Sequence, residues 1–193
     1  MATYYVSQDS GNDSNAGSEG SPFKTLSHAF YIAGNTGGGI TYGNTIIIND
    51  SATYNVTNGT SGTDNTSNQI EAYTGFLPRE FVIKAGDGCS PILDGGHSAN
   101  FAIEAYKDWV IEGITFRKFG SSIAHHHAIV ETTSRQAGTV RDCTIHAISG
   151  TAIKLTDNGT LVERCLIYDV AQRGIYGFDQ FTVSTRRTFD GKH

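Results

Sequence analysis

A short phrase recurs between residues 108 and 178, and it limits the possible folds of this chain more than any other feature. Each copy reads Val, two residues, Gly or Cys, one residue, then Thr or Ile, and the copies begin at Val110, Val140 and Val162. A second phrase lies between the copies, with central isoleucines 24 and then 22 residues apart: Ile129, Ile153 and Ile175. Self-similarity with a period in the twenties, built from β-favouring residues, is typical of a solenoid.

The repeat predicts coils stacked on one another rather than separate hairpins. Each unit has two or three short alternating runs and too few apolar residues to bury a face alone. Stacked units place equivalent positions about 4.8 Å apart, so that Cys143 is expected next to Cys165 and Ile153 next to Ile175. Nothing between the runs is long enough for the crossover helices of a βαβ sheet, and the Leu-x-x-Leu-x-Leu frame of leucine-rich repeats is absent. We therefore predict an all-β chain that forms a parallel β-helix of about six coils.

Composition narrows the possible partners. The 193 residues suffice for one domain with a real core. The net charge of −5 and the lack of a basic cluster argue against nucleic acid and anionic membranes. No apolar run approaches the length that spans a bilayer. Neither a nucleic-acid partner nor a membrane is therefore expected.

The first 39 residues predict a cap for the solenoid. A strand near residues 3–7 and a polar loop precede a stretch with helical spacing of its apolar residues: Phe23, Leu26, Phe30 and Ala33. Ser21 is a suitable N-cap, and Pro22 suits a first helical turn. An amphipathic helix laid across the end of a solenoid covers the strand edges and the open core. We expect residues 1–39 to form this cap and residues 40–193 to form the β-helix, within a single domain.

The opening of the chain resembles a known group of proteins. Residues 4–17 read Tyr-Tyr-Val-Ser-x-x-Ser-Gly-Asn-Asp-Ser-Asn-Ala-Gly, and residues 21–30 read Ser-Pro-Phe-Lys-Thr-Leu-x-x-Ala-Phe. With residues 43–46, 52–55, 81–85 and 92–95, they resemble right-handed parallel β-helices of the pectate-lyase-like superfamily. The resemblance implies the right-handed fold along nearly the whole chain. It does not specify the function, because the superfamily includes lyases, hydrolases, phage tailspikes and inert spacers.

The ends of the chain suggest an assembled, phage-encoded protein. No signal peptide precedes the first predicted strand, and a start at Met-Ala-Thr-Tyr-Tyr-Val resembles phage virion proteins, which leave the host by lysis. A further coil is expected to begin at Val183, so its edge would be left without a cap. Either the chain is part of a longer protein or another subunit covers this edge, in a homo-oligomer or among other virion subunits. The predicted location is a virion surface or the extracellular space.

A long polar loop is predicted at residues 57–79. It is rich in Thr, Asn, Ser and Gly, and loops of this length inside a compact domain are usually functional or disordered. Contact with a partner or ligand and a flexible insert are both open interpretations.

One column of side chains is predicted to face outward on three successive rungs. Alternation along the first phrase directs Phe116, His146 and Tyr168 to the outside. Such rings stack on sugars and on neighbouring subunits, so the column is a candidate for glycan binding or for an interface. A third interpretation is that loops of the chain itself cover the rings.

The second phrase provides another outward set and one carboxylate pair. Lys154 and Tyr176 are expected on its outer side, and Asp157 and Asp179 are 22 residues apart at a strand end. Carboxyl groups about 5 Å apart suit a retaining glycosidase or a Ca²⁺ ion. However, Asp157-Asn-Gly and Asp179-Gln also suit plain turns. The mid-strand acidic cluster and nearby base that a calcium-dependent lyase needs are not evident, so no cofactor is predicted.

Three further patterns are interpreted mainly as structural. The triplet at residues 125–127 offers at most two histidines on one face, without a neighbouring Cys or carboxylate, so a polar loop is favoured over zinc. Cys143 and Cys165 are expected to be buried thiols, with a disulfide between rungs as the alternative. Glu112, Asp142 and Arg164 are expected at one equivalent bend, where opposite charges fix the register.

These observations lead to a structural or surface-binding β-helix module of a larger assembly, of the phage decoration or tailspike type, that contacts glycans. The alternative is a polysaccharide lyase or glycoside hydrolase that acts on a cell-surface or acidic polysaccharide. In that case Asp157 and Asp179 would supply the carboxyl groups, with Lys154 or Arg173 as the nearby cation. A non-catalytic carbohydrate-binding surface is the third possibility.

Overall fold

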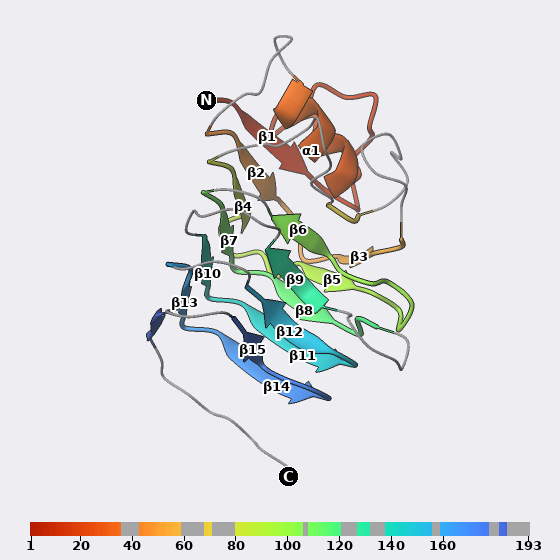
Figure 1. Ribbon diagram of the computed structural model, residues 1–193. Coiled ribbons are helices and arrows are strands. Elements are labelled where there is room, and N and C mark those ends of the chain that lie inside the picture. Colours follow the sequence, from red (N-terminus) through yellow and green to blue (C-terminus); the bar gives the residue numbers. More distant parts are fainter. Residues whose placement is uncertain are drawn as a thin grey trace.

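The chain winds into a right-handed parallel β-helix, whose coils stack from the N-terminal end to the C-terminal end (Figure 1). The computed structural model describes residues 1–35, 43–58, 68–70, 80–105, 108–120, 127–131, 138–155, 159–177 and 182–184. Every pair of named strands is parallel, and neighbouring strands of each sheet come from successive coils. This confirms the fold that the repeat predicts.

Three sheets form the sides of the solenoid in the described part of the chain. The first has seven strands in the order β1 (Thr3–Val6), β2 (Thr45–Ile48), β4 (Val82–Ala85), β7 (Val110–Glu112), β10 (Thr139–Arg141), β13 (Leu161–Glu163) and β16 (Thr182–Ser184). The second has five: β3 (Thr53–Asn55), β5 (Ile92–Asp94), β8 (Thr115–Arg117), β11 (Thr144–Ile148) and β14 (Leu166–Val170). The third has four: β6 (Ile103–Ala105), β9 (His127–Glu131), β12 (Thr151–Lys154) and β15 (Ile175–Tyr176).

Like side chains stack on like inside the solenoid. Ile153 pairs with both Ile129 and Ile175, as the second phrase predicts. Apolar residues at equivalent positions of the seven-stranded sheet form a buried row: Ile46, Ile83, Ile111, Val140 and Val162. Such rows remove each residue's apolar surface from water only when the neighbouring coil is present, because one coil alone has no second layer.

The first phrase has a different frame from the one predicted. Val110 pairs with Thr139, and its neighbour Ile111 pairs with Val140. The copy that begins at Val110 is therefore shifted by one residue relative to the copies at Val140 and Val162, which do align with each other. The alternation of apolar residues could not reveal this shift. Val110 and Ile111 are both β-branched, so either of them could have been the residue that faces inward. A shift of one residue reverses every side chain of a strand.

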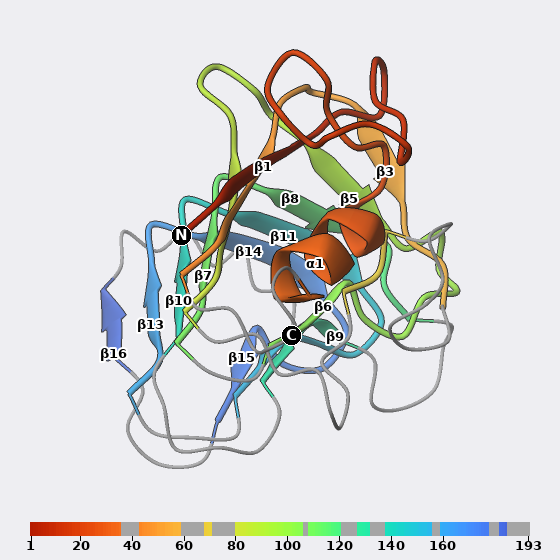
Figure 2. The same cartoon turned by 90° about the horizontal axis from the view of Figure 1, so that it is seen from above.

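Helix α1 (Leu26–Asn35) lies across the N-terminal end of the interior, where the view along the axis shows it between the sheets (Figure 2). Its buried side chains include Leu26, Phe30 and Ala33, so the predicted apolar face is confirmed. The predicted cap at Ser21 is wrong. The side chain of Thr25 accepts a hydrogen bond from the His28 N–H at 3.3 Å, so the helix begins four residues later.

The polar loop before the helix is tied to the first coil by Asp50 and Tyr54. The Tyr54 hydroxyl donates to Asp50 Oδ1 at 2.7 Å and accepts from the Gln8 N–H at 2.9 Å. Asp50 Oδ2 accepts from the Ser7 hydroxyl at 2.8 Å. Burial, followed by the hydrogen bond and negative charge of Asp50, raises the pKa of Tyr54 far above its ordinary value, so this tyrosine stays protonated and structural.

Part of the predicted 57–79 loop belongs to the solenoid. Ile70 is fully buried and forms a parallel bridge with Ile103, which places it in line with the four-stranded sheet. The amide of Asn68 accepts from the Leu26 N–H at 3.1 Å and donates to the Asn55 carbonyl at 3.0 Å, so it joins the cap helix to β3. Residues 59–67 and 71–79 lie outside the described part.

Among the described residues, no helix has the length and apolar character needed to cross a membrane; α1 itself has 10 residues.

Candidate functional site

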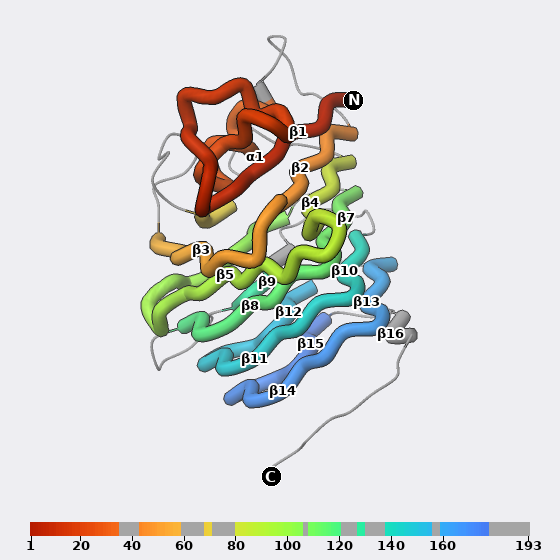
Figure 3. Tube along the Cα trace, turned by 180° about the vertical axis from the view of Figure 1, so that it is seen from behind, coloured from red at the N-terminus to blue at the C-terminus, as the bar shows by residue number. Residues whose placement is uncertain are grey.

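The outer side of the five-stranded sheet carries one continuous column of polar and aromatic side chains. Figure 3 shows this sheet from its outer side, with β3, β5, β8, β11 and β14 in succession. One position from each strand falls in register, and these residues, called the face ladder below, are Asn55, Asp94, Arg117, His146 and Tyr168. The position before each of them is buried, so alternation along the strands directs the face ladder outward.

Phe116 is not part of this surface. Its side chain is 0% exposed, and it pairs with Ile145 in the buried row. The prediction that Phe116 faces outward is therefore wrong, and the reason is the one-residue shift of the first phrase. Arg117 occupies the place on this rung, in register with His146. The predictions that His146 and Tyr168 face outward on neighbouring rungs are confirmed.

His146 and Tyr168 form a stacked aromatic pair, called the platform below. Their ring centroids are 4.9 Å apart, and the planes differ by 1°. Tyr168 is 37% exposed, whereas His146 is half-buried. The hydrogen bonds between β11 and β14 fix this spacing, because the rung separation of a parallel sheet matches the distance between stacked rings. The result is a partly exposed Tyr168 ring, stacked on His146 and held in place by the backbone of the two strands.

Charged groups lie beside the platform on the preceding rungs. Arg117 Nε is 2.7 Å from Asp94 Oδ2, and Lys118 Nζ is 3.4 Å from the same oxygen. The Gly96 N–H donates to Asp94 Oδ1 at 2.9 Å. Burial by itself would raise the pKa of Asp94, but the Gly96 hydrogen bond and Arg117 outweigh it, so this pKa lies below its ordinary value. Asp94 is thus ionised at neutral pH and fixes the two cations.

His146 is kept neutral by its surroundings. Burial and the positive charge of Arg117 lower its pKa, and the opposing effect of Asp169 and Asp94 is smaller. At neutral pH the imidazole therefore presents one donor and one acceptor nitrogen. A neutral imidazole beside cations is suited to accept a proton or a hydrogen bond from a bound molecule.

On three successive rungs, the residue that directly follows the face-ladder residue in the chain has a left-handed backbone. Lys118, Ala147 and Asp169 have φ values of 58°, 55° and 51°. Residues with a Cβ adopt this conformation uncommonly, so its recurrence is a built feature of this sheet edge. It bends each strand directly after the outward side chain, and Lys118 thereby reaches the carboxylate of Asp94.

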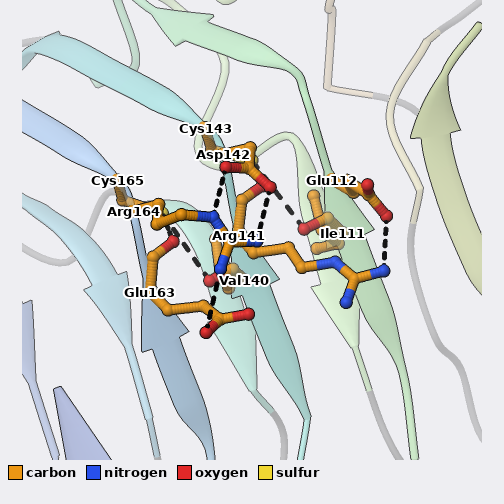
Figure 4. A network of polar contacts seen from close by, with 9 residues as sticks. All are labelled: Ile111, Glu112, Val140, Arg141, Asp142, Cys143, Glu163, Arg164 and Cys165. Atoms are coloured by element: carbon orange, nitrogen blue, oxygen red, sulfur yellow. Dashed lines mark hydrogen bonds and ion pairs between the residues drawn. The ribbon is translucent and has the colours of Figure 1, made fainter. Parts of the chain in front are cut away.

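A second column of charges lies at the corner between the seven-stranded and five-stranded sheets. These residues, called the turn ladder below, are Glu112, Arg141, Asp142, Glu163 and Arg164 (Figure 4). Arg141 contacts Glu112 at 2.7 Å, and Arg164 contacts Glu163 at 3.2 Å. Arg164 also makes two hydrogen bonds to Asp142, at 2.7 Å and 2.8 Å.

The structure corrects the predicted alignment of these charges. Asp142 and Arg164 do lie on neighbouring rungs and pair with each other, as expected. Glu112 aligns with Arg141 instead of Asp142. The hydrogen bonds from Arg164 lower the pKa of Asp142, and the same contacts raise that of Arg164. Every charged side chain of the turn ladder thus has an ionic partner within the ladder.

Lys154 and Tyr176 lie on a different surface from the face ladder. They are in register on neighbouring strands of the four-stranded sheet, and both are half-buried. The guanidinium carbon of Arg173 is 4.6 Å from the centroid of the Tyr176 ring, a cation–π contact. The predicted binding residues are therefore divided between two sheets, and His146 and Tyr168 form the more complete cluster.

Several candidates fall outside the described residues: Asp157, Asp179, His125 and His126. The third member of the triplet, His127, is buried, and its Nδ1 lies 3.3 Å from the Thr151 carbonyl oxygen. Within the described ranges, no three His, Cys, Asp or Glu side chains come together in a way that could hold a metal ion.

Sequence analysis missed Arg117, Lys118 and Asp94. A signal for them does exist at the corner position before each five-stranded rung. Gly113, Asp142 and Arg164 all have positive φ there, and Gly and Asp are residues that tolerate this conformation. Alignment on Gly113 and Asp142, rather than on the valines, would have placed Arg117 beside His146.

Comparison with known proteins supports the fold. No protein-family model matches the sequence, and no curated protein matches it. A solved structure described as a rhamnogalacturonan lyase matches with a TM-score of 0.57 at 16% identity, over 95% of this chain and 54% of that one. A GH136 lacto-N-biosidase from Eubacterium ramulus matches with a TM-score of 0.49 at 11% identity, over 90% of this chain and 43% of that one. The chain spans about half the length of the structures it matches.

Proposed function

We propose that this β-helix binds glycan chains on its face ladder. The observation that carries the proposal is the stacked His146–Tyr168 platform with its partly exposed Tyr168 ring, beside which Asp94 fixes Arg117 and Lys118. An exposed ring binds the apolar face of a sugar, and cations next to it donate charge-assisted hydrogen bonds to hydroxyl or carboxylate oxygens. The ligand class that uses both features is an acidic polysaccharide.

The fold gives this proposal indirect support. The rhamnogalacturonan lyase that resembles this chain is named for an activity on a polysaccharide, although the likeness at 16% identity concerns the fold alone. A flat outer side on a parallel solenoid suits a long polymer, because equivalent positions recur along the axis.

The test is binding of acidic and neutral oligosaccharides, measured by calorimetry for the wild type and two variants. Tyr168→Ala removes the exposed half of the platform, and we expect affinity to fall by about 10-fold or more, as for the loss of a buried ring contact. Tyr31→Ala is the matched control, because Tyr31 on α1 is 36% exposed and lies away from the five-stranded sheet. Equal affinity of all three proteins would contradict the proposal. Addition of a chelator should not change the affinity, since the platform needs no ion.

Cleavage is the second candidate, and the neutral state of His146 favours it. In β-elimination a base removes the proton beside a uronate carboxylate, while a cation stabilises the developing charge. His146 would be the base that takes this proton, and Arg117 would face the carboxylate; as the C=C bond forms, the glycosidic C–O bond at the β carbon breaks, and the leaving oxygen takes a proton from solvent. The product carries a C=C bond conjugated with the carboxylate, so ultraviolet absorbance rises as the polymer shortens. New reducing ends without that absorbance would instead indicate hydrolysis, for which Asp157 and Asp179 remain the predicted carboxyl groups.

The assembly role predicted from the sequence stays a prediction. In that view the module is a homo-oligomer or a subunit of a virion or cell-surface structure, and Lys154 and Tyr176 contribute to its contacts. Sedimentation of the full chain tests self-association: a Tyr176→Asp variant should shift an oligomer toward monomer, and a wild-type monomer would contradict the homo-oligomer.

A further inference from the structure

Cys143 and Cys165 occupy equivalent corner positions on neighbouring coils. Each directly precedes the first residue of its strand in the five-stranded sheet, where Thr144 pairs with Leu166. Their side chains have matching surroundings. The Cys143 thiol lies 3.2 Å from the Arg141 carbonyl oxygen, and the Cys165 thiol lies 3.3 Å from the equivalent Glu163 oxygen. Both are free thiols, and each is the side-chain hydrogen-bond partner of the other.

This placement meets the geometric requirement of a disulfide. Adjacent strands of a parallel sheet hold equivalent Cα atoms about 4.8 Å apart, and disulfides span about 4.4–6.8 Å between Cα atoms. Because equivalent positions of in-register parallel strands direct their side chains to the same side, a bond between the two cysteines requires rotation of side chains and no separation of the coils.

The two thiols differ in access and acidity. Cys143 is 1% exposed, whereas Cys165 is half-buried on the outermost of the two coils. Burial raises the pKa of Cys143, while the hydrogen bond from Cys143 lowers the pKa of Cys165. Cys165 is thus the thiol that ionises and meets a small oxidant first, with Cys143 directly behind it.

We propose that Cys143 and Cys165 form a reversible disulfide that links two successive coils of the solenoid. With hydrogen peroxide as the oxidant, the Cys165 thiolate attacks one peroxide oxygen, which gives a sulfenic acid and releases hydroxide. The sulfur of Cys143 then attacks the sulfenic sulfur; its proton and the sulfenic hydroxyl leave as water. In sum, two thiols lose two electrons and two protons, and one peroxide becomes two water molecules.

The bond would act on the coils that carry the aromatic platform. His146 and Tyr168 each lie three residues after one of these cysteines, on β11 and β14. A covalent link at the start of both strands therefore holds the two rungs together next to the platform. It also closes a loop of the unfolded chain, which disfavours unfolding of these two coils.

The experiment uses the full chain with Cys89→Ser, which removes the third cysteine at a corner of an earlier coil. After peroxide treatment we expect a mass loss of about 2 Da, the loss of both free thiols to alkylation, and recovery of both with a thiol reductant. Cleavage after Lys and Arg should yield peptides 142–154 and 165–173 joined by a disulfide. The oxidised protein should melt roughly 5–10 °C higher. Two thiols that stay reactive, or a covalent dimer in place of the internal link, would overturn the proposal.

Two single variants test the order of the steps. Cys143→Ser should leave a sulfenic acid at Cys165 that a dimedone probe traps, because no second thiol remains to resolve it. Cys165→Ser should show no adduct at the buried Cys143 under the same treatment. Adduct at Cys143 alone would overturn the assignment of Cys165 as the attacking thiol, and the intact-mass measurement on the C89S chain tests the bond itself independently of either variant.

Discussion

The turn ladder and the face ladder run through the same coils, and they use charge in opposite ways. In the turn ladder, acids and bases alternate between rungs and neutralise one another, as the bidentate contact of Arg164 with Asp142 shows. In the face ladder, the carboxylate of Asp94 holds two cations, and the next two rungs carry the rings of His146 and Tyr168. Each charged side chain of the turn ladder has an ionic partner within the ladder, whereas the face ladder ends in a partly exposed aromatic pair.

This difference separates the contacts that fix the alignment of the coils from the residues that we propose bind a ligand. Exposed ion pairs contribute about 0–1 kcal/mol each to stability, so the turn ladder favours one alignment of the coils without dominating the energy. Asp94 differs from the turn ladder because its side chain is only 8% exposed. Removal of the partners of a buried carboxylate destabilises the fold more than removal of an exposed ion pair does. The repeat thus places register-fixing ion pairs at one position of the coil and the proposed binding residues a few positions later.

The largest expected effect on stability tests whether Phe116 or Arg117 is the residue of β8 that faces outward. Phe116→Ala should lower the free energy of unfolding by about 3–5 kcal/mol, because the ring is fully buried in the row beside Ile145. Arg117→Ala, one residue away, should lower it by about 1–2 kcal/mol, because the largely buried Asp94 keeps Lys118 and the Gly96 N–H as partners. Chemical denaturation of both variants measures this, and similar losses for the two would contradict the corrected frame.

The next effect contrasts one carboxylate from each ladder. Asp94→Asn should cost about 1–3 kcal/mol, because Arg117 and Lys118 lose their counter-charge at a largely buried group. Glu112→Gln should cost about 0–1 kcal/mol, since its contact with Arg141 is half-exposed. Urea denaturation at constant salt compares them. If Glu112→Gln proved the more damaging change, the turn ladder would be the structural core of the charge pattern.

A smaller effect should depend on pH through His146. Its folded pKa lies below the ordinary value of 6.5, so the unfolded chain binds the proton more readily than the folded one. Stability is therefore full above pH 6.5 and declines as the pH falls through the lower folded value. His146→Gln should flatten the unfolding free energy in this window. A decline that persists unchanged in this variant would assign the proton to another group.

The carboxylates of both ladders should act in a more acidic window. Asp94 and Asp142 have pKa values below the ordinary 3.8, so their contribution is present above pH 3.8 and is lost as the pH falls through their folded values. Asp94→Asn should remove more of this acid sensitivity than Asp142→Asn, because Asp142 is exposed and screened by solvent.

The smallest effect should be that of the pair with two hydrogen bonds, Arg164 and Asp142. Arg164→Ala, Asp142→Ala and the double variant form a cycle, and we expect no coupling beyond measurement error at physiological salt, because both side chains are exposed. Affinity for glycans should also stay unchanged in Arg164→Ala. A coupling that resists high salt would show that the turn ladder contributes to stability as well as to register.

The sequence sufficed to predict the coil and its buried rows, for a physical reason. Each coil needs its neighbours to bury apolar surface, so the period is written in the apolar residues themselves, as in Ile129, Ile153 and Ile175. His146 and Tyr168 were placed correctly because their copies align from Val140 to Val162 without an insertion.

The rest of the site was not predictable from alternation alone. Two adjacent β-branched residues, Val110 and Ile111, satisfy either frame, so Phe116 was exchanged with Arg117. Asp94 comes from a still earlier coil and reaches Lys118 only because the backbone turns left-handed at that residue. A left-handed backbone can be predicted from the sequence where glycine adopts it. Here Lys118, Ala147 and Asp169 adopt it, so the sequence gives no such signal at these positions.

The backbone hydrogen bonds between β8, β11 and β14 set the spacing of the outward side chains whatever those side chains are. A change of one residue on the outer side therefore alters the chemistry of a single rung and leaves the distances along the rest of the row intact. On the proposed function, isolated substitutions on this side would therefore change which polymer the ladder prefers while the winding of the chain stays the same.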